Sequence, residues 1–409
     1  MIKLVITITK VEIEEISTSM ELILIISILI IIHGYGGYII PIVFFGLFKK
    51  RKINKSSDAS KYHTICIVIA AYNEESCIEE KIINTLDIDY PKEYLNIFIV
   101  TDGSTDNTVD IVNKYKEVRC FHQNVRLGKM AAIDRVMPFI NNEITVFTDA
   151  NTLLNKDCLT FINTHFNNSN IGGVAGEKKI NTNNSSSSNK ANQEGIYWKY
   201  ESFLKKIDSS YYSVVGAAGE LYAIRTSLYE YPGKDIILDD FIISLNICKK
   251  GYLFKYEPNA YATELPSLNI KEESKRKIRI AAGSIQAIFK LKELLNIFKY
   301  PMLSYLYLSH RVLRWTIIPI LLILVFIVNL ILQIEQPSPW ITSLFIIQFI
   351  FYTLGLLGYF KFIKLSKLTS IPFYFIFMNV SQIIGAYRYI MGNQKVTWEN
   401  QRERNNEQK

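Results

Sequence analysis

The stretch Ile144-Thr145-Val146-Phe147-Thr148-Asp149-Ala150-Asn151 decides the fold of the soluble part of this chain. It begins with β-branched and aromatic residues, which are typical of a central strand buried on both faces of a parallel sheet. Polar side chains that follow such a strand lie in the crevice where open α/β sheets bind ligands. The octet therefore predicts a central strand with a ligand site at its carboxyl end.

Two polar side chains close the octet. Asp149 and Asn151 are two residues apart, so in an extended chain they point to the same side. Their oxygens suit a hard cation such as Mg2+ or Mn2+, which would neutralise a diphosphate. The same octet also fits a strand followed by an Asx turn and a helix cap, so the rest of the chain has to decide between the two interpretations.

Earlier runs of the chain repeat this pattern of an apolar strand followed by a helix. They are Thr64–Ala71, Tyr94–Thr101 and Val118–His122. Strands that alternate with helices of about ten residues indicate βαβ units and a parallel sheet. Glu74, Asp102 and Asp149 follow strands of this set, and in a doubly wound sheet such strand ends lie side by side. We therefore expect these carboxylates at one edge of the sheet.

The second half of the soluble part is less regular. Asn181–Asn192 is a low-complexity polar segment, which we interpret as a loop rather than a domain boundary. Gly195–Lys206 has the pattern of an amphipathic helix, with Tyr197, Tyr200 and Glu201 on one face.

A basic helix is predicted from Glu272 to Lys290. Arg276 and Arg279 lie on one face of it, together with further basic residues at its start. One interpretation is a clamp for phosphate groups, and the other is a basic helix that lies on the membrane surface. The two interpretations are compatible.

Apolar runs long enough to cross a bilayer as helices lie at both ends of the 409-residue chain. They are Glu21–Phe48, Val312–Gln333, Trp340–Phe360 and Ile371–Met391. Basic residues flank them at Lys49–Lys52 and at Lys361, Lys364 and Lys367. Because basic loops stay in the cytoplasm, we expect a multi-pass protein of the cell membrane with a cytoplasmic soluble domain.

Charge and cysteine content agree with that placement. The net charge of +8 is modest and concentrated beside the apolar runs, which indicates anionic lipid head groups rather than nucleic acid as the partner. The five cysteines are scattered without a CxxC pair, as is typical of reduced thiols in a cytosolic domain.

The polar residues together suit a substrate with a diphosphate leaving group. Asp102 can accept hydrogen bonds from a nucleoside, and Lys129 at a helix start can pair with phosphate beside free backbone N–H groups. Asp149 and Asn151 can hold a cation.

The remaining tasks fall to residues further along the chain. Asp240 or Asp239 can act as the general base, since adjacent carboxylates raise one pKa toward the range that a base needs. Arg276 and Arg279 can clamp the departing diphosphate, which the planar guanidinium suits. An Asp-Asp pair is also a common solvated surface feature.

In this order the motifs resemble those of the family 2 glycosyltransferases, in the membrane-embedded branch that includes cellulose, hyaluronan and poly-N-acetylglucosamine synthases. The matching residues are Ala71-Tyr72-Asn73-Glu74, Thr101-Asp102-Gly103-Ser104-Thr105-Asp106, Gly128-Lys129, Thr148-Asp149-Ala150-Asn151, Asp239-Asp240 and the basic block from Arg276 to Arg279. The resemblance runs from about Thr64 to Gly283, and more weakly through the last apolar runs.

This resemblance implies a GT-A fold, meaning a Rossmann-like mixed but mostly parallel sheet, here flanked by transmembrane helices. It implies inverting transfer from a nucleotide-sugar donor, usually a UDP-sugar, to a glycan or lipid-linked acceptor, with Mg2+ or Mn2+ as cofactor. Asp240 would be the general base, and Asp102 would contact the uridine with Tyr72 and Glu74 nearby.

The sequence departs from the family pattern at two places. Asn151 stands where the metal motif commonly has a second aspartate, so the second cation ligand is neutral. The family's Gln-x-x-Arg-Trp is replaced by Arg276-Lys277-Ile278-Arg279-Ile280, which keeps the arginine and loses the aromatic residue. Processive synthesis therefore does not follow from the resemblance, and transfer of one or a few sugars fits as well.

Other functions remain open at this point. A nucleotidyltransferase that makes nucleotide-sugars uses a similar sheet, but Ala71-Tyr72-Asn73-Glu74 lacks the glycine-rich phosphate loop expected of it. A non-catalytic transporter or scaffold would bind the nucleotide-sugar without turnover. We divide the chain into an amino-terminal membrane segment (1–52), a GT-A domain (60–283), interfacial amphipathic helices (284–311), a membrane bundle of about three spans (312–392) and a polar tail (393–409).

Overall fold

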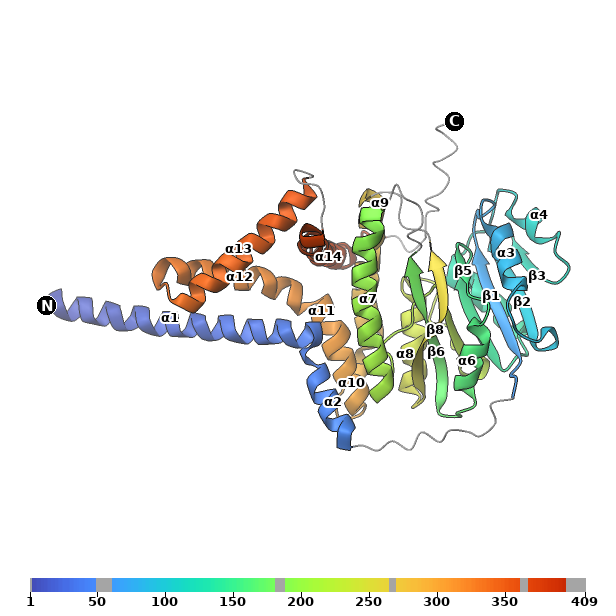
Figure 1. Cartoon of the computed structure of the whole chain (residues 1–409), viewed down its shortest axis with the longest axis horizontal. Helices are drawn as coiled ribbons and strands as arrows, with labels where there is room; N and C mark the ends of the chain where they lie inside the picture. The colour runs from blue at the N-terminus through green and yellow to red at the C-terminus, as the bar shows by residue number, and fades with distance from the viewer. Residues whose placement is uncertain (1, 49–60, 181–187, 265–269, 361–366, 395–409) are drawn as a thin grey trace.

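The computed structural model describes residues 2–48, 61–180, 188–264, 270–360 and 367–394. It has two parts, a domain built on a β-sheet and a group of long apolar helices that projects from one side of it (Figure 1). The basic cluster Lys49–Lys52, the residues Lys361 and Lys364, the first part of the Asn181–Asn192 segment and most of the polar tail lie outside the described residues.

The domain contains an eight-stranded sheet with the strand order β3-β2-β1-β4-β7-β6-β8-β5. The strands are β1 Ile65–Ala71, β2 Leu95–Asp102, β3 Arg119–Gln123, β4 Ile144–Asp149, β5 Thr152–Leu154, β6 Ile171–Ile180, β7 Tyr222–Arg225 and β8 Leu253–Glu264. The first four are parallel neighbours, and β7 enters antiparallel between β4 and β6. The fold is therefore the mixed, mostly parallel α/β sheet that the sequence predicts.

The register of the parallel strands brings their carboxyl ends to one edge. Ala70 of β1 pairs with Asp149, and Ala71 pairs with Thr101, so Asp102 and Asp149 end the strands on either side of β1. This is the edge at which the polar residues were expected.

Helices cover both faces of the sheet. They are α3 Ile78–Leu86, α4 Thr108–Val112, α5 Lys129–Val136, α6 Cys158–Phe166, α7 Ser188–Tyr211, α8 Asp239–Lys249 and α9 Ile270–Lys290, with short 3-10 turns at Lys92–Tyr94, Met137–Phe139, Thr226–Leu228 and Lys292–Leu295. Along β1 the odd residues Ile65, Ile67 and Ile69 belong to one apolar core, and Cys66 and Val68 belong to the other. The alternation of side chains along a strand thus supplies both cores.

Helix α7 differs from the sequence prediction. It begins at Ser188 instead of Gly195, so the last residues of the low-complexity segment are helical, and it continues to Tyr211. A polar composition lowers helix propensity only slightly, and packing of the apolar face against the domain outweighs it.

The apolar part consists of α1 Ile2–Ile32, a π-helical turn η1 His33–Gly37, α2 Ile39–Phe48, α12 Ile317–Glu335, α13 Pro339–Tyr359 and α14 Lys367–Ile390. Shorter elements join it to the domain, namely α10 Pro301–Leu306, the π-helical η6 Tyr307–Val312 and α11 Leu313–Trp315. Within the described residues, four stretches are long and apolar enough to cross a membrane: Glu15–Gly37, Ile317–Glu335, Pro339–Tyr359 and Thr369–Ile390. The chain is thus a membrane protein.

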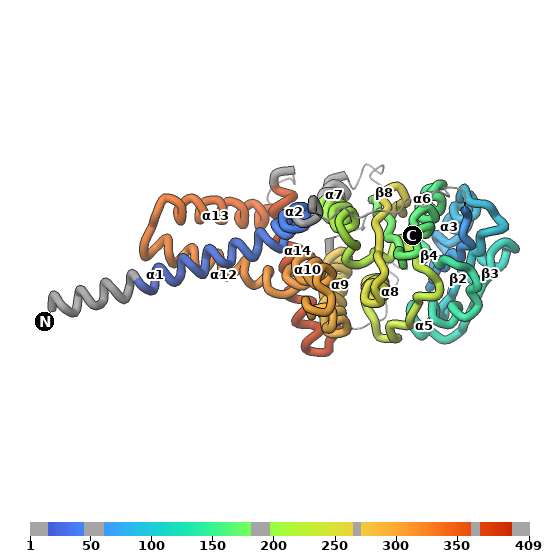
Figure 2. The backbone as a smooth tube through the Cα atoms, turned by 90° about the horizontal axis from the view of Figure 1, so that it is seen from below, coloured from blue at the N-terminus to red at the C-terminus, as the bar shows by residue number. Residues whose placement is uncertain are grey.

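These long helices do not all run in the same direction. Helices α1 and α12 extend away from the domain along the long axis of the molecule, whereas α14 is seen end-on in Figure 1 and along its length in Figure 2. Helix α14 therefore lies crosswise to α1 and α12. Its Gly385 packs against α9, since a Cβ built there would lie 2.4 Å from Ala281 Cβ. Helix α14 thus joins the membrane helices to the sheet domain.

Candidate active site

Three charged side chains from different elements meet beside Gly219, in the turn before β7. A Cβ atom built at Gly219 would lie 3.6 Å from Asp240 Oδ2, 3.8 Å from Lys129 Nζ and 3.9 Å from Asp149 Oδ2. Asp149 ends β4, Lys129 begins α5 and Asp240 lies in the first turn of α8. Residues that are more than 100 positions apart in the sequence are therefore brought together at the carboxyl edge of the sheet.

Lys129 lies between the carboxylates of this site. Its ammonium group donates to Asp149 Oδ1 at 2.9 Å and lies 3.7 Å from Asp239 Oδ2. The amino terminus of α8 also carries the partial positive charge of the helix dipole, which favours acidic residues in its first turn.

The three carboxylates of this site are only partly neutralised by the cations near them. Burial, together with the negative charge of Asp239, raises the pKa of Asp240 to about 7, although Lys129 opposes the shift. Burial also raises the pKa of Asp149. Arg279 of α9 is the second cation that acts on these acids, and burial lowers the pKa of its guanidinium against the attraction of Asp239, Asp240 and Asp149. A carboxyl with a pKa near neutrality is suited to accept a proton.

Asp102 positions the segment that carries Lys129. Its two carboxylate oxygens accept hydrogen bonds from the backbone N–H groups of Leu127 at 2.9 Å and Gly128 at 2.7 Å. Gly128 has a φ of 98°, a conformation that favours glycine, and it is followed directly by the first residue of α5. Asp102 thus fixes the turn that directs Lys129 toward Asp149.

The turn after β1 holds Tyr72 and Glu74. The guanidinium of Arg126 lies 3.7 Å from the centre of the Tyr72 ring, and both residues adjoin the Asp102 loop. Glu74 is buried and accepts a hydrogen bond from Cys77 Sγ at 3.1 Å, while its backbone N–H donates to Thr108 Oγ1 at 2.8 Å. Arg126 thus joins Tyr72 to the loop that follows Asp102, and Glu74 stabilises the turn after β1 through its hydrogen bonds.

Asn151 and Arg276 make different contacts from those that the sequence suggested. Strand β4 ends at Asp149, so the alternation of side chains does not extend to Asn151, whose amide donates to Glu264 Oε1 of β8 at 3.3 Å. Arg276 is paired with Glu273 on its own helix, at 3.1 Å. Asp149 and Arg279, in contrast, belong to the group of charges around Gly219.

The described residues contain no group of three or more His, Cys, Asp or Glu side chains arranged to hold a metal ion. Magnesium in nucleotide sites is often held by only one or two carboxylates together with the phosphates of the substrate. The half-buried Asp149 meets that requirement, so the site fits a divalent cation that is completed by a diphosphate.

Two lysines near the site were missed by the sequence analysis. Lys178 of β6 donates hydrogen bonds to Glu220, at 2.5 Å, and to Glu264. Burial opposes the ionisation of the Glu220 carboxyl, but its pairing with Lys178 outweighs burial and lowers the pKa of Glu220 to about 2. Lys81 is fully buried and donates to Thr148 Oγ1 at 2.9 Å, just before Asp149, and burial lowers its pKa to about 7. A lone lysine on the apolar face of the predicted helix after Glu75 was the available clue to Lys81.

A second group of charges, which we call the junction cluster, connects α7 with the segment that leads into the membrane helices. It consists of Glu201, Asp208, His310, Arg311 and Arg314. Glu201 pairs with Arg311 at 3.1 Å and with Arg314 at 2.5 Å, and His310 Nδ1 lies 2.6 Å from Asp208.

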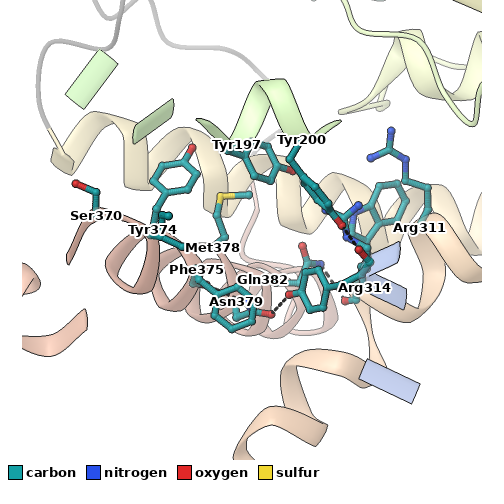
Figure 3. Close-up of a pocket in the computed structure, with 13 residues that line it drawn as sticks. Tyr197, Tyr200, Arg311, Arg314, Ser370, Tyr374, Phe375, Met378, Asn379 and Gln382 are labelled. Carbon is teal, nitrogen blue, oxygen red and sulfur yellow. Dashed lines mark hydrogen bonds between the residues drawn. The ribbon is translucent and has the colours of Figure 1, made fainter. Parts of the chain in front are cut away.

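A cavity of about 310 Å³ borders the junction cluster (Figure 3). We call it the tyrosine cavity, because Tyr35, Tyr197, Tyr200 and Tyr374 line it, together with side chains of η6, α11 and α14. Trp315 also lines it and packs on Phe241 with ring centres 5.0 Å apart. Phe241 is the residue after Asp240, so α8 carries both a carboxylate of the active site and a ring that packs against this cavity wall.

The mixed sheet and the acidic groups at its carboxyl edge define a GT-A type of glycosyltransferase domain. Its fold is that of the mannosyltransferase PcManGT from Pyrobaculum calidifontis, solved with GDP-Man and Mn2+, with a TM-score of 0.67 and 19% identity over 91% of this chain and 100% of that one. The model of the glycosyl transferase family 2 matches residues 66–230, so this part of the chain is similar to that family. Asp239, Asp240 and α9 lie beyond the matched residues.

Curated relatives agree with the family. The chain is 24% identical over 273 residues to a poly-beta-1,6-N-acetyl-D-glucosamine synthase of Staphylococcus epidermidis, which covers 62% of this chain and 63% of the relative. It is 25% identical over 256 residues to the synthase of the same name from Staphylococcus aureus, covering 58% and 59%. The match thus spans slightly less than two thirds of these relatives.

Proposed function

We propose that the chain is a membrane-bound, inverting glycosyltransferase that moves a sugar from a nucleotide-sugar, with UDP-sugar as the expected donor, to a glycan or lipid-linked acceptor. The observation that carries the proposal is the meeting of Asp149, Lys129 and Asp240 around Gly219. It combines a carboxyl near neutral pKa with a cation and a carboxylate at the edge where α/β sheets bind nucleotides.

Asp240 is the proposed general base. It takes the proton from the acceptor hydroxyl as the acceptor oxygen attacks the anomeric carbon from the side opposite the diphosphate, which inverts that carbon. The raised pKa makes Asp240 a strong enough base for this step while it remains ionised above neutral pH.

Lys129 and Arg279 are proposed to stabilise the charge that develops on the departing diphosphate. Both act on the same three carboxylates, so a bound diphosphate would exchange carboxylate partners for phosphate oxygens. Asp149 would hold a divalent cation, Mg2+ or Mn2+, with the phosphates completing its coordination. The cation would supply Lewis-acid neutralisation of the leaving group. The Mn2+ and GDP-Man of the Pyrobaculum enzyme support this assignment.

The nucleoside would lie at the ends of β1 and β2. Strand β1 separates Asp102 from Asp149, which corresponds to about 10 Å at the usual strand spacing. That distance suits a nucleoside at one end and its diphosphate at the other. Tyr72 offers a ring for the base, and Asp102 shapes the turn beside it.

The arrangement of the same helices supports a proposed orientation in the membrane. Helix α12 leaves the domain and α13 returns toward it, so the tight turn between them lies on the side away from the domain (Figure 1). The basic segments Lys49–Lys52 and Lys361–Lys367 follow the ends of α2 and α13 that face the domain. By the positive-inside rule, the domain and its active site would face the cytoplasm.

The test is a donor screen on the purified full-length protein in nanodiscs. Wild-type protein is incubated with UDP-sugars and GDP-Man, with Mn2+ or Mg2+ or with a chelator, and nucleoside diphosphate release and the product anomer are measured. We expect release with one donor class, loss of release with the chelator, and an inverted product. Donor binding without turnover would contradict the proposal and favour a binding protein, and release of pyrophosphate would indicate a nucleotidyltransferase.

A further inference from the structure

A second, apolar cavity lies next to the tyrosine cavity. This second cavity measures about 380 Å³ and lies between α12, α13 and α14, where the lining residues include Leu322, Phe326 and Leu356. We call it the apolar groove. Phe375 and Asn379 of α14 line both spaces, so the two cavities share a wall.

The two cavities offer opposite chemistry. The groove presents mainly hydrocarbon, and the hydroxyl of Tyr352 is turned to the backbone carbonyl of Leu322 at 3.3 Å. The tyrosine cavity carries aromatic rings with hydroxyl groups, the amide of Gln382 and the guanidinium of Arg314. Asn379 marks the border, since its side-chain oxygen accepts from the Tyr35 hydroxyl at 3.2 Å.

Arg314 is suited to bind a polar ligand group in the tyrosine cavity. Its side chain is nine-tenths buried and lies between the rings of Tyr35 and Tyr200, 5.5 and 5.6 Å from their centres. One guanidinium nitrogen, Nη2, is paired with Glu201, while Nη1 has no hydrogen-bond partner in the part of the chain that the structure describes. A buried N–H group without an acceptor costs free energy, which an oxygen of a ligand would recover.

We propose that the acceptor is a membrane lipid with a hydroxylated head group, such as a glycolipid. This inference rests on the proposed glycosyl transfer. The head group lies in the tyrosine cavity against Arg314 and Trp315, and the hydrocarbon chains lie in the apolar groove between α12 and α14. The tyrosine cavity has the volume of about ten water molecules, which is comparable to one hexose ring.

The contact between Trp315 and Phe241 connects the head group to the reaction. Because Phe241 follows Asp240 in α8, the proposal requires that a head group beside Trp315 reach this base with one hydroxyl. The oxygen of that hydroxyl forms a bond to the anomeric carbon, the bond from that carbon to the diphosphate breaks, and the diphosphate leaves with the electron pair. The proton goes to Asp240.

The apolar groove argues against a growing polysaccharide as the occupant. A sugar chain that entered it would bury hydroxyl groups without acceptors, which costs free energy for each group. Hydrocarbon chains carry no such cost and enter the groove from the surrounding bilayer. A lipid acceptor whose hydroxyl is deprotonated also explains why the site retains a base, since a lipid phosphate would attack without one.

The experiment compares two tryptophan substitutions on α12. Ile323 lines the groove and is 53% exposed, whereas Ile320, one turn away, is 63% exposed and lies outside the lining. Ile323→Trp and Ile320→Trp are made in the full-length protein in nanodiscs. Each receives radiolabelled donor with one of three acceptors: monoglucosyl-diacylglycerol in the bilayer, a soluble hexose oligosaccharide, or a polyisoprenyl phosphate. Transfer is read in the solvent-extractable and aqueous fractions, beside donor hydrolysis by water.

We expect label in the extractable glycolipid, a loss of at least tenfold for Ile323→Trp, and no loss for Ile320→Trp, while donor hydrolysis stays unchanged in both variants. Label in the soluble oligosaccharide or in a water-soluble polymer would overturn the lipid acceptor and leave the transferase intact. Label in the polyisoprenyl phosphate, or an equal loss in both variants, would also overturn it. Absence of both transfer and donor hydrolysis in wild-type protein with every acceptor would instead contradict the proposed function itself.

Discussion

Two groups of buried charges are built from the same residue types, and they differ in how their charges balance. In the junction cluster, two carboxylates face two arginines and His310, and Glu201, Asp208 and His310 are almost completely buried. At the active site, three carboxylates face Lys129 and Arg279, and the side chains of Lys129 and Asp149 are 35% and 27% exposed. The junction cluster is shielded from solvent and its charges balance, whereas the active site is partly exposed and has more negative than positive groups.

The pKa shifts follow from this difference. Burial opposes the ionisation of Glu201, but the adjacent guanidinium groups of Arg314 and Arg311 hold its pKa well below the usual range. At the active site burial dominates, and a neighbouring carboxylate adds to it, so the pKa of Asp240 rises to about 7. A matched cluster stabilises the fold, whereas an excess of like charge keeps a group ready to exchange a proton or bind a cation.

The largest effect is expected for Asp240→Asn. Removal of a general base costs about 10²- to 10⁴-fold in rate, so we expect kcat to fall by that factor. Stability should not decrease, because the substitution removes a carboxylate whose ionisation is opposed by burial and by Asp239. Nucleoside diphosphate release and the thermal midpoint are measured together. Asp235→Asn, at an exposed position in the loop before α8, is the control and should leave both unchanged. Full activity of Asp240→Asn would remove Asp240 from the reaction.

The opposite behaviour is expected when the matched cluster is broken. Glu201→Gln leaves Arg311 and Arg314 buried without a negative partner at Glu201, and loss of one partner of a buried ion pair costs about 3–5 kcal/mol. We expect a markedly lower thermal midpoint in detergent, with near-normal kcat for the protein that remains folded.

The matched control for Glu201→Gln is Asp87→Asn. Asp87 pairs with Lys156 at 2.9 Å, and both side chains are more than 60% exposed. Exposed surface pairs of this kind contribute little to stability, so the midpoint should hardly change. Equal shifts in the two variants would show that the junction cluster is not stabilising.

Helix α9 carries one arginine of each kind, one that acts on the active-site carboxylates and one that is paired on its own helix. Arg279 acts on the active-site carboxylates, whereas Arg276 is paired with Glu273 one turn away. Arg279→Lys loses the planar fork for the diphosphate, and we expect kcat/KM for the donor to fall about 10- to 100-fold, as for a hydrogen bond to a charged group. Arg276→Lys should leave kcat/KM for the donor nearly unchanged, since lysine keeps the positive charge that pairs with Glu273. Equal losses would place both arginines on the diphosphate.

The strands and their polar ends were predictable because their pattern is local. A run such as Ile144–Asp149 is apolar up to its end, and parallel strands bring such ends to one edge. This was sufficient to predict that Asp102 and Asp149 lie at the same edge. The pair Asp239-Asp240 was suggested by its two adjacent carboxylates, and the choice of Asp240 came from the resemblance. The structure brings Asp240 to that edge.

Contacts that depend on turns or on distant segments were not predictable. The pairing of Asn151 with Glu264 depends on where β4 ends, which the sequence leaves uncertain by a residue or two. Glu201 and Arg311 are 110 positions apart, so their ion pair exists only after α7 has packed against η6. Glu220 lies in the glycine-rich turn before β7, and no periodic pattern distinguishes it from a surface residue. Periodicity identifies faces of elements, whereas ion pairs depend on the packing of those faces.

The smallest expected effect is a displacement of the pH profile. Asp240 must be ionised to accept a proton, so a pKa of about 7 means that activity is lost as the pH falls below 7. For wild-type protein, kcat/KM should decline about tenfold for each pH unit below that value, as for a single essential base. The profile should be flat between pH 8 and 9.

Asp239→Asn tests how much of the rise in the pKa of Asp240 is caused by the negative charge of Asp239. The substitution removes the negative charge beside Asp240, so the pKa of Asp240 falls and the acidic limb of the profile moves to lower pH. The move should be partial, because burial is the larger cause and it remains. The variant should therefore retain more of its own maximal activity at pH 6 than the wild type does, whatever its absolute rate. A limb that moves to higher pH would mean that Asp239 acts mainly by holding Lys129 in place, since loss of that cation would raise the pKa of Asp240.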